Sequence, residues 1–125
     1  MSTVLTNPYS NQVAISATTW TKFAECASPL TNLSINYRLL SRDLTSDVKI
    51  RVAQVPVTFI EASAQPTDDQ WIQPFDLILG PNGVKTGIAE DTGFILPVGF
   101  KLIAKADKVQ VTAKAHGYTK QVIGA

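Results

Sequence analysis

The single histidine, His116, is the first residue to test for chemistry, because an imidazole can serve as a general base near neutral pH. It stands at a polar position of an alternating stretch, and the sequence has neither a Gly-x-Ser-x-Gly elbow nor a Cys-His signature to supply a nucleophile. The only cysteine, Cys26, has no disulfide partner and no adjacent basic residue that would lower the pKa of its thiol. We therefore expect His116 on the surface or in an interface, Cys26 as a partly buried structural thiol, and no enzymatic activity.

Five of the ten acidic residues lie in two polar stretches, Glu61 with Asp68 and Asp69, and Glu90 with Asp91. Neither stretch has the Asp-x-Asp-x-Asp-Gly spacing that a calcium loop needs. The glycines at positions 80, 83, 87, 93 and 99 form neither Gly-x-Gly-x-x-Gly nor a phosphate-binding loop, and no helix pattern follows them. The sequence therefore predicts solvated loop carboxylates and turn glycines, with no metal site and no cofactor.

The C-terminal part of the sequence is locally basic, with five lysines against the single acid Asp107: Lys101, Lys105, Lys108, Lys114 and Lys120. A nucleic-acid face would also need interleaved aromatic side chains, and only Phe100 and Tyr118 are near. We expect solvated lysines on strand edges, where they oppose unwanted strand pairing, and no nucleic-acid partner.

Five aromatic residues could together line a sugar-binding groove: Tyr9, Trp20, Tyr37, Trp71 and Tyr118. Tyr37 and Trp71 fall on the apolar side of alternating stretches, which favours the core for both. Trp20 and Tyr9 have no such assignment. A carbohydrate-binding module that recognises a host glycan is therefore one of the open alternatives.

The elements that position these residues belong to one domain, since 125 residues suffice for a single core. Hydrophobic residues make up 45% of the chain and charged residues 17%, with a formal net charge of +1. That balance argues against bulk attraction to nucleic acid or to an anionic membrane, and no apolar run reaches the roughly 18 residues of a membrane helix. The N-terminus has neither a basic region nor a long apolar region, so we expect synthesis in the cytoplasm rather than secretion.

Alternation of apolar and polar residues predicts strands along most of the chain. Leu33–Leu39 is the clearest example, with apolar side chains at every odd position. Val48–Val55 alternates too, but its apolar parity switches near Ala53–Gln54, which predicts a one-residue bulge or a break at Pro56. Val57–Ile60 is expected to continue into another sheet or an edge.

Further short strands are expected on both sides of these two. Phe100–Ala104 and Val109–Ala115 alternate on either side of a tight turn, which predicts a hairpin. The remaining candidates are Thr18–Cys26, Trp71–Leu79, Val84–Ile88 and Phe94–Val98. About eight short strands at this spacing predict an all-β fold, a single β-sandwich or jelly-roll-like domain.

The two ends of the chain lack this pattern. We expect residues 1–11 to form an extended N-terminal arm, residues 12–118 the β-sandwich domain and residues 119–125 a C-terminal tail. Ordering an arm costs about 1–2 kcal/mol of backbone entropy per residue, more than its few apolar side chains can offset against their own domain. We therefore expect the arm to bind an adjacent subunit or another protein, with strand addition at an exposed edge as one route. Its candidate interface residues are Val4, Leu5, Pro8 and Tyr9.

The stretch from Ile50 to Gly117 is informative as a succession of short motifs. It contains Ile-Arg-Val-Ala at 50–53, Asp-Gln-Trp-Ile at 69–72, Pro-Asn-Gly-Val at 81–84, Thr-Gly-Ile at 86–88, Phe-Ile-Leu at 94–96, Val-Gly-Phe-Lys-Leu at 98–102 and Val-Gln-Val-Thr-Ala at 109–113. A strand with Arg-Val-Ala, a Trp-Ile strand, a polar turn and a final Gly-x-x-Leu hairpin follow one another. In this the chain resembles small β-sandwich virion proteins of tailed bacteriophages, of the decoration or tail-associated type.

The resemblance implies a non-enzymatic structural protein of a bacteriophage virion, with no inherited catalytic residues. Capsid decoration, in which a cement protein clamps neighbouring subunits, is the first expectation, and attachment to the tail, neck or fibre is the second. A carbohydrate-binding module is the third. The implied partners are further copies of the chain, for example in a trimer, and the major capsid or tail protein, with the virion as the final location.

Overall fold

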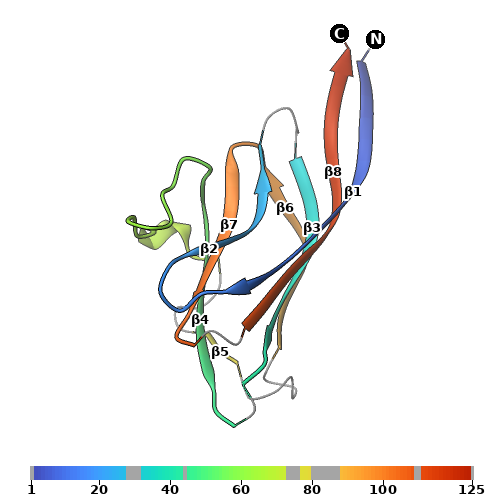
Figure 1. The fold of residues 1–125 in the computed structure, drawn as a ribbon. Coiled ribbons are helices and arrows are strands. Elements are labelled where there is room, and N and C mark those ends of the chain that lie inside the picture. The colour runs from blue at the N-terminus through green and yellow to red at the C-terminus, as the bar shows by residue number, and fades with distance from the viewer. Residues whose placement is uncertain are drawn as a thin grey trace.

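The computed structural model describes residues 2–27, 32–43, 45–72, 77–79, 88–108 and 111–124, and over these ranges the chain forms eight strands and no α-helix. The strands are β1 (Ser2–Ile15), β2 (Thr21–Cys26), β3 (Asn32–Ser41), β4 (Val48–Pro56), β5 (Leu77–Leu79), β6 (Ile88–Pro97), β7 (Phe100–Ala106) and β8 (Val111–Gly124), with a 3₁₀ turn at Asp68–Gln70. Sheet A has the order β1-β8-β3-β6 and sheet B the order β2-β7-β4-β5. The two sheets pack face to face around one core (Figure 1), which confirms the expected all-β sandwich.

The strand order is that of a jelly roll. The first strand pairs antiparallel with the last, the second with the seventh, the third with the sixth and the fourth with the fifth. The chain thus has the topology of one long hairpin wound into a sandwich, with successive pairs in opposite sheets. As a result β1 and β8, from opposite ends of the chain, run side by side (blue and red in Figure 1).

The core lies between the sheets and follows the alternation read from the sequence. In β3 the odd residues Leu33, Ile35, Tyr37 and Leu39 are fully buried, and the even residues face away from the core. The Tyr37 ring packs between two phenylalanines, with centroid distances of 5.6 Å to Phe23 and 5.9 Å to Phe94. These tilted and edge-on contacts join strands of both sheets.

The parity switch in β4 has a different cause from the one expected. The register between β4 and β7 runs without a shift from Ile50 to Pro56, so the strand has no bulge against β7. Ala53 and Val55 point away from the main core, into a second buried cluster that contains Trp20 and Ile103. The segment that follows β4 turns at Val57–Thr58 instead of continuing as a strand, and it covers this cluster. β4 is therefore buried on both faces along part of its length. In the sequence, a strand buried in this way shows the same switch in apolar parity as a strand with a bulge.

One further strand expectation is corrected. The predicted hairpin does not form, because β7 belongs to sheet B and β8 to sheet A. The chain crosses between the sheets after Ala106, as a jelly roll requires. Of the predicted strand Trp71–Leu79, Leu77–Leu79 forms β5 and Trp71 forms an isolated bridge to Ala53, whereas residues 73–76 lie outside the described residues. The predicted strand Val84–Ile88 lies outside the described residues except for Ile88, where β6 begins.

The expected arm and tail pair with each other. Residues 2–15 form one uninterrupted strand, and its register with β8 runs from Ser2 opposite Gly124 to Ile15 opposite Val111. The backbone partners of residues 2–11 therefore lie in the same chain, because residues 115–124 supply the matching strand. In the described part of β3, pairing with β8 ends at Lys120. Beyond that point residues 2–5 and 121–124, here called the terminal ribbon, extend away from the sandwich (Figure 1).

Gly117 allows β8 to pass close to β3. A Cβ atom at this position would lie 2.0 Å from the Ser34 carbonyl oxygen and 2.8 Å from the Ile35 Cα atom. Tyr9 stands opposite Gly117 in β1 and packs against the main core. Only glycine fits this crossing, because any Cβ would meet the backbone of β3.

Candidate interaction surface

The candidate catalytic residues lie apart. His116 is exposed on the outer face of sheet A, whereas Cys26 is fully buried at the end of β2 in sheet B. Burial raises the pKa of the Cys26 thiol, which keeps it protonated and unreactive. Within the described residues, no three histidine, cysteine or acidic side chains are grouped so that they could hold a metal ion.

Lys101 differs from the expectation of a solvated lysine. Its ammonium is buried and donates hydrogen bonds to the Glu61 carboxylate at 2.5 Å and to the Phe59 carbonyl at 2.8 Å. Burial tends to raise the pKa of Glu61, but hydrogen bonding and attraction to Lys101 outweigh it and lower that pKa. This ion pair fastens the segment after β4 to sheet B, so Glu61 has a structural contact as well.

The other charged candidates are distributed over the surface. Lys108 donates to the Ser46 hydroxyl at 2.6 Å and to the Asp47 carbonyl at 3.0 Å, across the β3–β4 connection. Asp68 and Asp69 are exposed in the 3₁₀ turn, as expected of solvated carboxylates.

The aromatic residues separate into core and surface groups. Trp20 keeps only 4% of its surface exposed. Its ring centroid lies 5.6 Å from that of the half-buried Trp71. Tyr37 lies in the main core, and Tyr9 is half-buried against that core, where burial raises the pKa of its hydroxyl. Tyr118 alone of the five is well exposed, at 57%. The two rings left open by the sequence, Trp20 and Tyr9, are therefore turned inward rather than set out as sugar platforms.

The outer face of sheet A aligns exposed side chains that are largely apolar from three of its four strands, with Ser34 of β3 between two of them. The register places Pro8 opposite Tyr118, Tyr118 opposite Ser34, and Ser34 opposite Ile95. Pro8, Tyr118 and Ile95 are all exposed, Ile95 at 61%. We call these four residues the docking row. Such an alignment uses one residue from each strand, and it exists only because the pairing registers agree.

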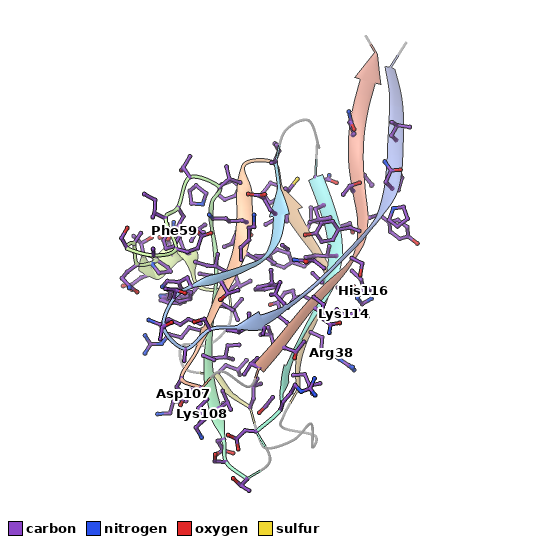
Figure 2. The ribbon with its side chains drawn as sticks, in the orientation of Figure 1. Arg38, Phe59, Asp107, Lys108, Lys114 and His116 are labelled. Carbon is purple, nitrogen blue, oxygen red and sulfur yellow. The ribbon has the colours of Figure 1, made fainter. Side chains whose placement is uncertain are left out.

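Basic side chains flank the docking row. On the outer face of β8, His116 is the next residue after Tyr118 toward the start of the strand. Lys114 follows it and lies directly opposite Arg38 of β3. All three point away from the sandwich in Figure 2. Lys120 lies on the other side of the row, also exposed. The register also places one acid on this face, Glu90 of β6, directly opposite Arg38.

The predicted interface residues of the arm divide between this face and the core. Pro8 belongs to the docking row, and Leu5 is exposed in the terminal ribbon. Tyr9 packs inward, and the side chain of Val4 lies outside the described part of the chain. The sequence did not single out Ile95 and recognised Tyr118 only as an aromatic. The three consecutive apolar residues Phe94, Ile95 and Leu96 show no parity in the sequence, and the alignment of the row depends on register.

Comparison of the chain with protein-family models finds no match, and comparison with curated proteins finds none either. No helix within the described residues is long and apolar enough to cross a membrane.

Proposed function

We propose that this chain is a non-enzymatic structural subunit of a bacteriophage virion, and in the first place a capsid decoration protein that clamps neighbouring subunits. The docking row carries the proposal, because aligned exposed apolar side chains favour a surface that a partner covers. The jelly-roll topology supports it by analogy, since capsid proteins use this fold, as lectins and cupins also do.

The basic flank defines the chemistry of the partner. The exposed ammonium groups of Lys114 and Lys120 give the described part of the face a positive character, so a second copy placed face to face would be repelled. The partner proposed for the docking row is therefore a flat protein surface that combines apolar and acidic side chains, as on the particle beneath. Copies of the chain associate instead along β1, the outermost strand of sheet A, by strand addition beside the terminal ribbon.

Substitution of the docking row tests the proposal. We expect Ile95→Asp to lower occupancy on purified particles by at least about tenfold, because it places a carboxylate in the apolar contact, at the β6 end of the docking row. Ile60→Asp is the matched control, since Ile60 is exposed to 62%, against 61% for Ile95, and lies on the segment after β4. Quantitative mass spectrometry of the particles gives both occupancy and copy number.

The outcomes separate the alternatives. Wild-type copy number comparable to that of the major capsid protein supports decoration, whereas a few copies per particle would favour the tail, neck or fibre. Equal occupancy of Ile95→Asp and Ile60→Asp would overturn the assignment of the docking row. Absence of the wild-type chain from particles would refute the virion proposal itself.

A further inference from the structure

The outer edge of β1 differs in charge from the other edges of the two sheets. β1 pairs with β8 on one side only, and on its other side no strand of the described chain lies beside it. Its 14 residues include no charged side chain. The edge strands β2 and β6 do carry charges, Lys22 and Glu25 in β2 and Glu90 and Asp91 in β6, and the edge strand β5 has only three residues. Charge and shortness both oppose pairing between molecules, and β1 has neither protection.

The two halves of β1 differ in their contacts with sheet B. In the second half, the Asn11 side-chain amide donates to the Phe23 carbonyl of β2 at 2.9 Å, and the Tyr9 hydroxyl is hydrogen-bonded to the backbone of Glu25. The first half continues into the terminal ribbon, which extends away from the sandwich (Figure 1). A two-stranded ribbon on its own is marginally stable in water. A further strand beside the ribbon would therefore stabilise it.

Pro8 indicates which backbone groups of β1 face outward. A proline has no N–H to donate, so within a sheet its nitrogen faces away from the neighbouring strand. Because the direction of the backbone groups alternates along an antiparallel strand, Ser2, Val4 and Thr6 also direct their N–H and C=O groups away from β8. An added strand can bond to these three residues but meets no donor at Pro8. The open part of the edge is therefore residues 2–6.

We propose that residues 2–6 of two copies of the chain pair antiparallel about a two-fold axis at Val4, so that sheet A becomes continuous across the dimer. This pairing rests on the association along β1 that forms part of the proposed function. The segment suits a second copy of itself, because Val4 then lies opposite Val4 and Ser2 opposite Thr6 of the other copy. No like charges meet, since the segment is uncharged, and the outward backbone groups of both copies gain partners.

This symmetry places the two docking rows on one side of the dimer. Two identical antiparallel strands in one sheet are related by a two-fold axis normal to that sheet, so the outer faces of sheet A in both copies point the same way. A flat partner surface can then contact both docking rows, and the second contact forms at a raised effective concentration. The dimer is therefore a bivalent clamp.

Sedimentation equilibrium of the full chain tests the pairing without any particle. The contact is small, so we expect a reversible dimer with a dissociation constant on the order of 0.1 mM. Val4→Pro keeps the β1–β8 ladder, because the nitrogen at this position faces outward as in Pro8, but removes the central donor. It should weaken the dimer by at least about tenfold. Gln12→Pro, exposed and of the same parity in the same strand, is the matched control and should leave the affinity within about twofold.

A second variant retains the N–H and tests the symmetry. Val4→Lys sets two ammonium groups directly opposite each other, so the dimer should weaken by about tenfold at low salt and recover at high salt. Val98→Lys adds the same charge in the turn between β6 and β7, where Val98 is 45% exposed, and should leave the dimer unchanged. Weakening by Val4→Lys that salt does not relieve would contradict the axis at Val4.

Three further outcomes would overturn the β1 contact: a monomer at about 1 mM, a trimer, or equal weakening by Val4→Pro and Gln12→Pro. Occupancy on particles is measured separately, through Ile95→Asp. A monomeric chain that still occupies particles would refute the dimer and leave the docking row standing. A dimer that is absent from particles would refute the virion proposal and leave the β1 contact standing.

Discussion

On sheet A the outward side chains of β8 and β3 meet solvent, whereas on sheet B half of the outward side chains of β4 and β7 are covered by residues 57–72. Both faces carry directly opposed cations, Arg38 with Lys114 and Arg51 with Lys105. On sheet B, residues 57–72 bury outward apolar residues in a second core. A groove remains beside this covered region. On sheet A comparable residues remain exposed in a flat row. The comparison teaches that the same alternation yields a second core where a loop covers it and an exposed apolar row where none does.

The largest test of this difference replaces one aromatic residue on each face. Trp20→Ala removes most of the second core and should lower the free energy of unfolding by about 3–5 kcal/mol. Tyr118→Ala should change it by no more than about 0.5 kcal/mol, because Tyr118 is exposed. Urea unfolding of both variants measures the contrast. Similar losses would mean that sheet A also depends on its outer side chains for stability.

Gly117→Ala tests whether the stability of sheet A, which carries the docking row, depends on the close passage of β8 beside β3. The added methyl group meets backbone atoms of Ser34 and Ile35, which have little room to move, so we expect a loss of about 1–3 kcal/mol. Gly93→Asn is the control. Its Cβ has open space, and asparagine tolerates the positive φ of 68° better than other residues. Equal effects of the two changes in urea unfolding would contradict the steric argument.

The smallest effect is expected for the ion pair between Lys101 and Glu61, which holds the segment after β4 against sheet B. The pKa of Glu61 is lowered in the folded protein, so its contribution is present above its unfolded value of about 4.3 and is lost as pH falls through the acid range. Glu61→Gln should cost less than about 1 kcal/mol at neutral pH, since 30% of the Glu61 side chain is exposed. The difference from wild type should shrink as the pH falls below about 4.3, as measured by thermal melts across pH. A constant difference at all pH values would argue against the ion pair.

Much of the sandwich was predictable because burial on one face leaves a period of two, as in β3. The pattern was ambiguous where Ala53 and Val55 are covered on the second face, since a bulge and a two-sided strand have the same parity. The crossing after Ala106 resembles a hairpin locally, and only the choice of partner strands distinguishes the two. For the same reason neither the docking row nor the groove was predictable, because each joins residues through register.

The pairing of β1 with β8 also sets the order of events during synthesis. β1 is made first, yet its hydrogen-bond partner is the last strand, so sheet A remains incomplete until residues 111–124 have left the ribosome. Until then the nascent chain exposes the apolar inner faces of β1 and β3, which are prone to aggregate. We therefore expect β4, β5 and β7, which are closer in sequence, to associate earlier, with the closing of β1 on β8 as the last step of folding.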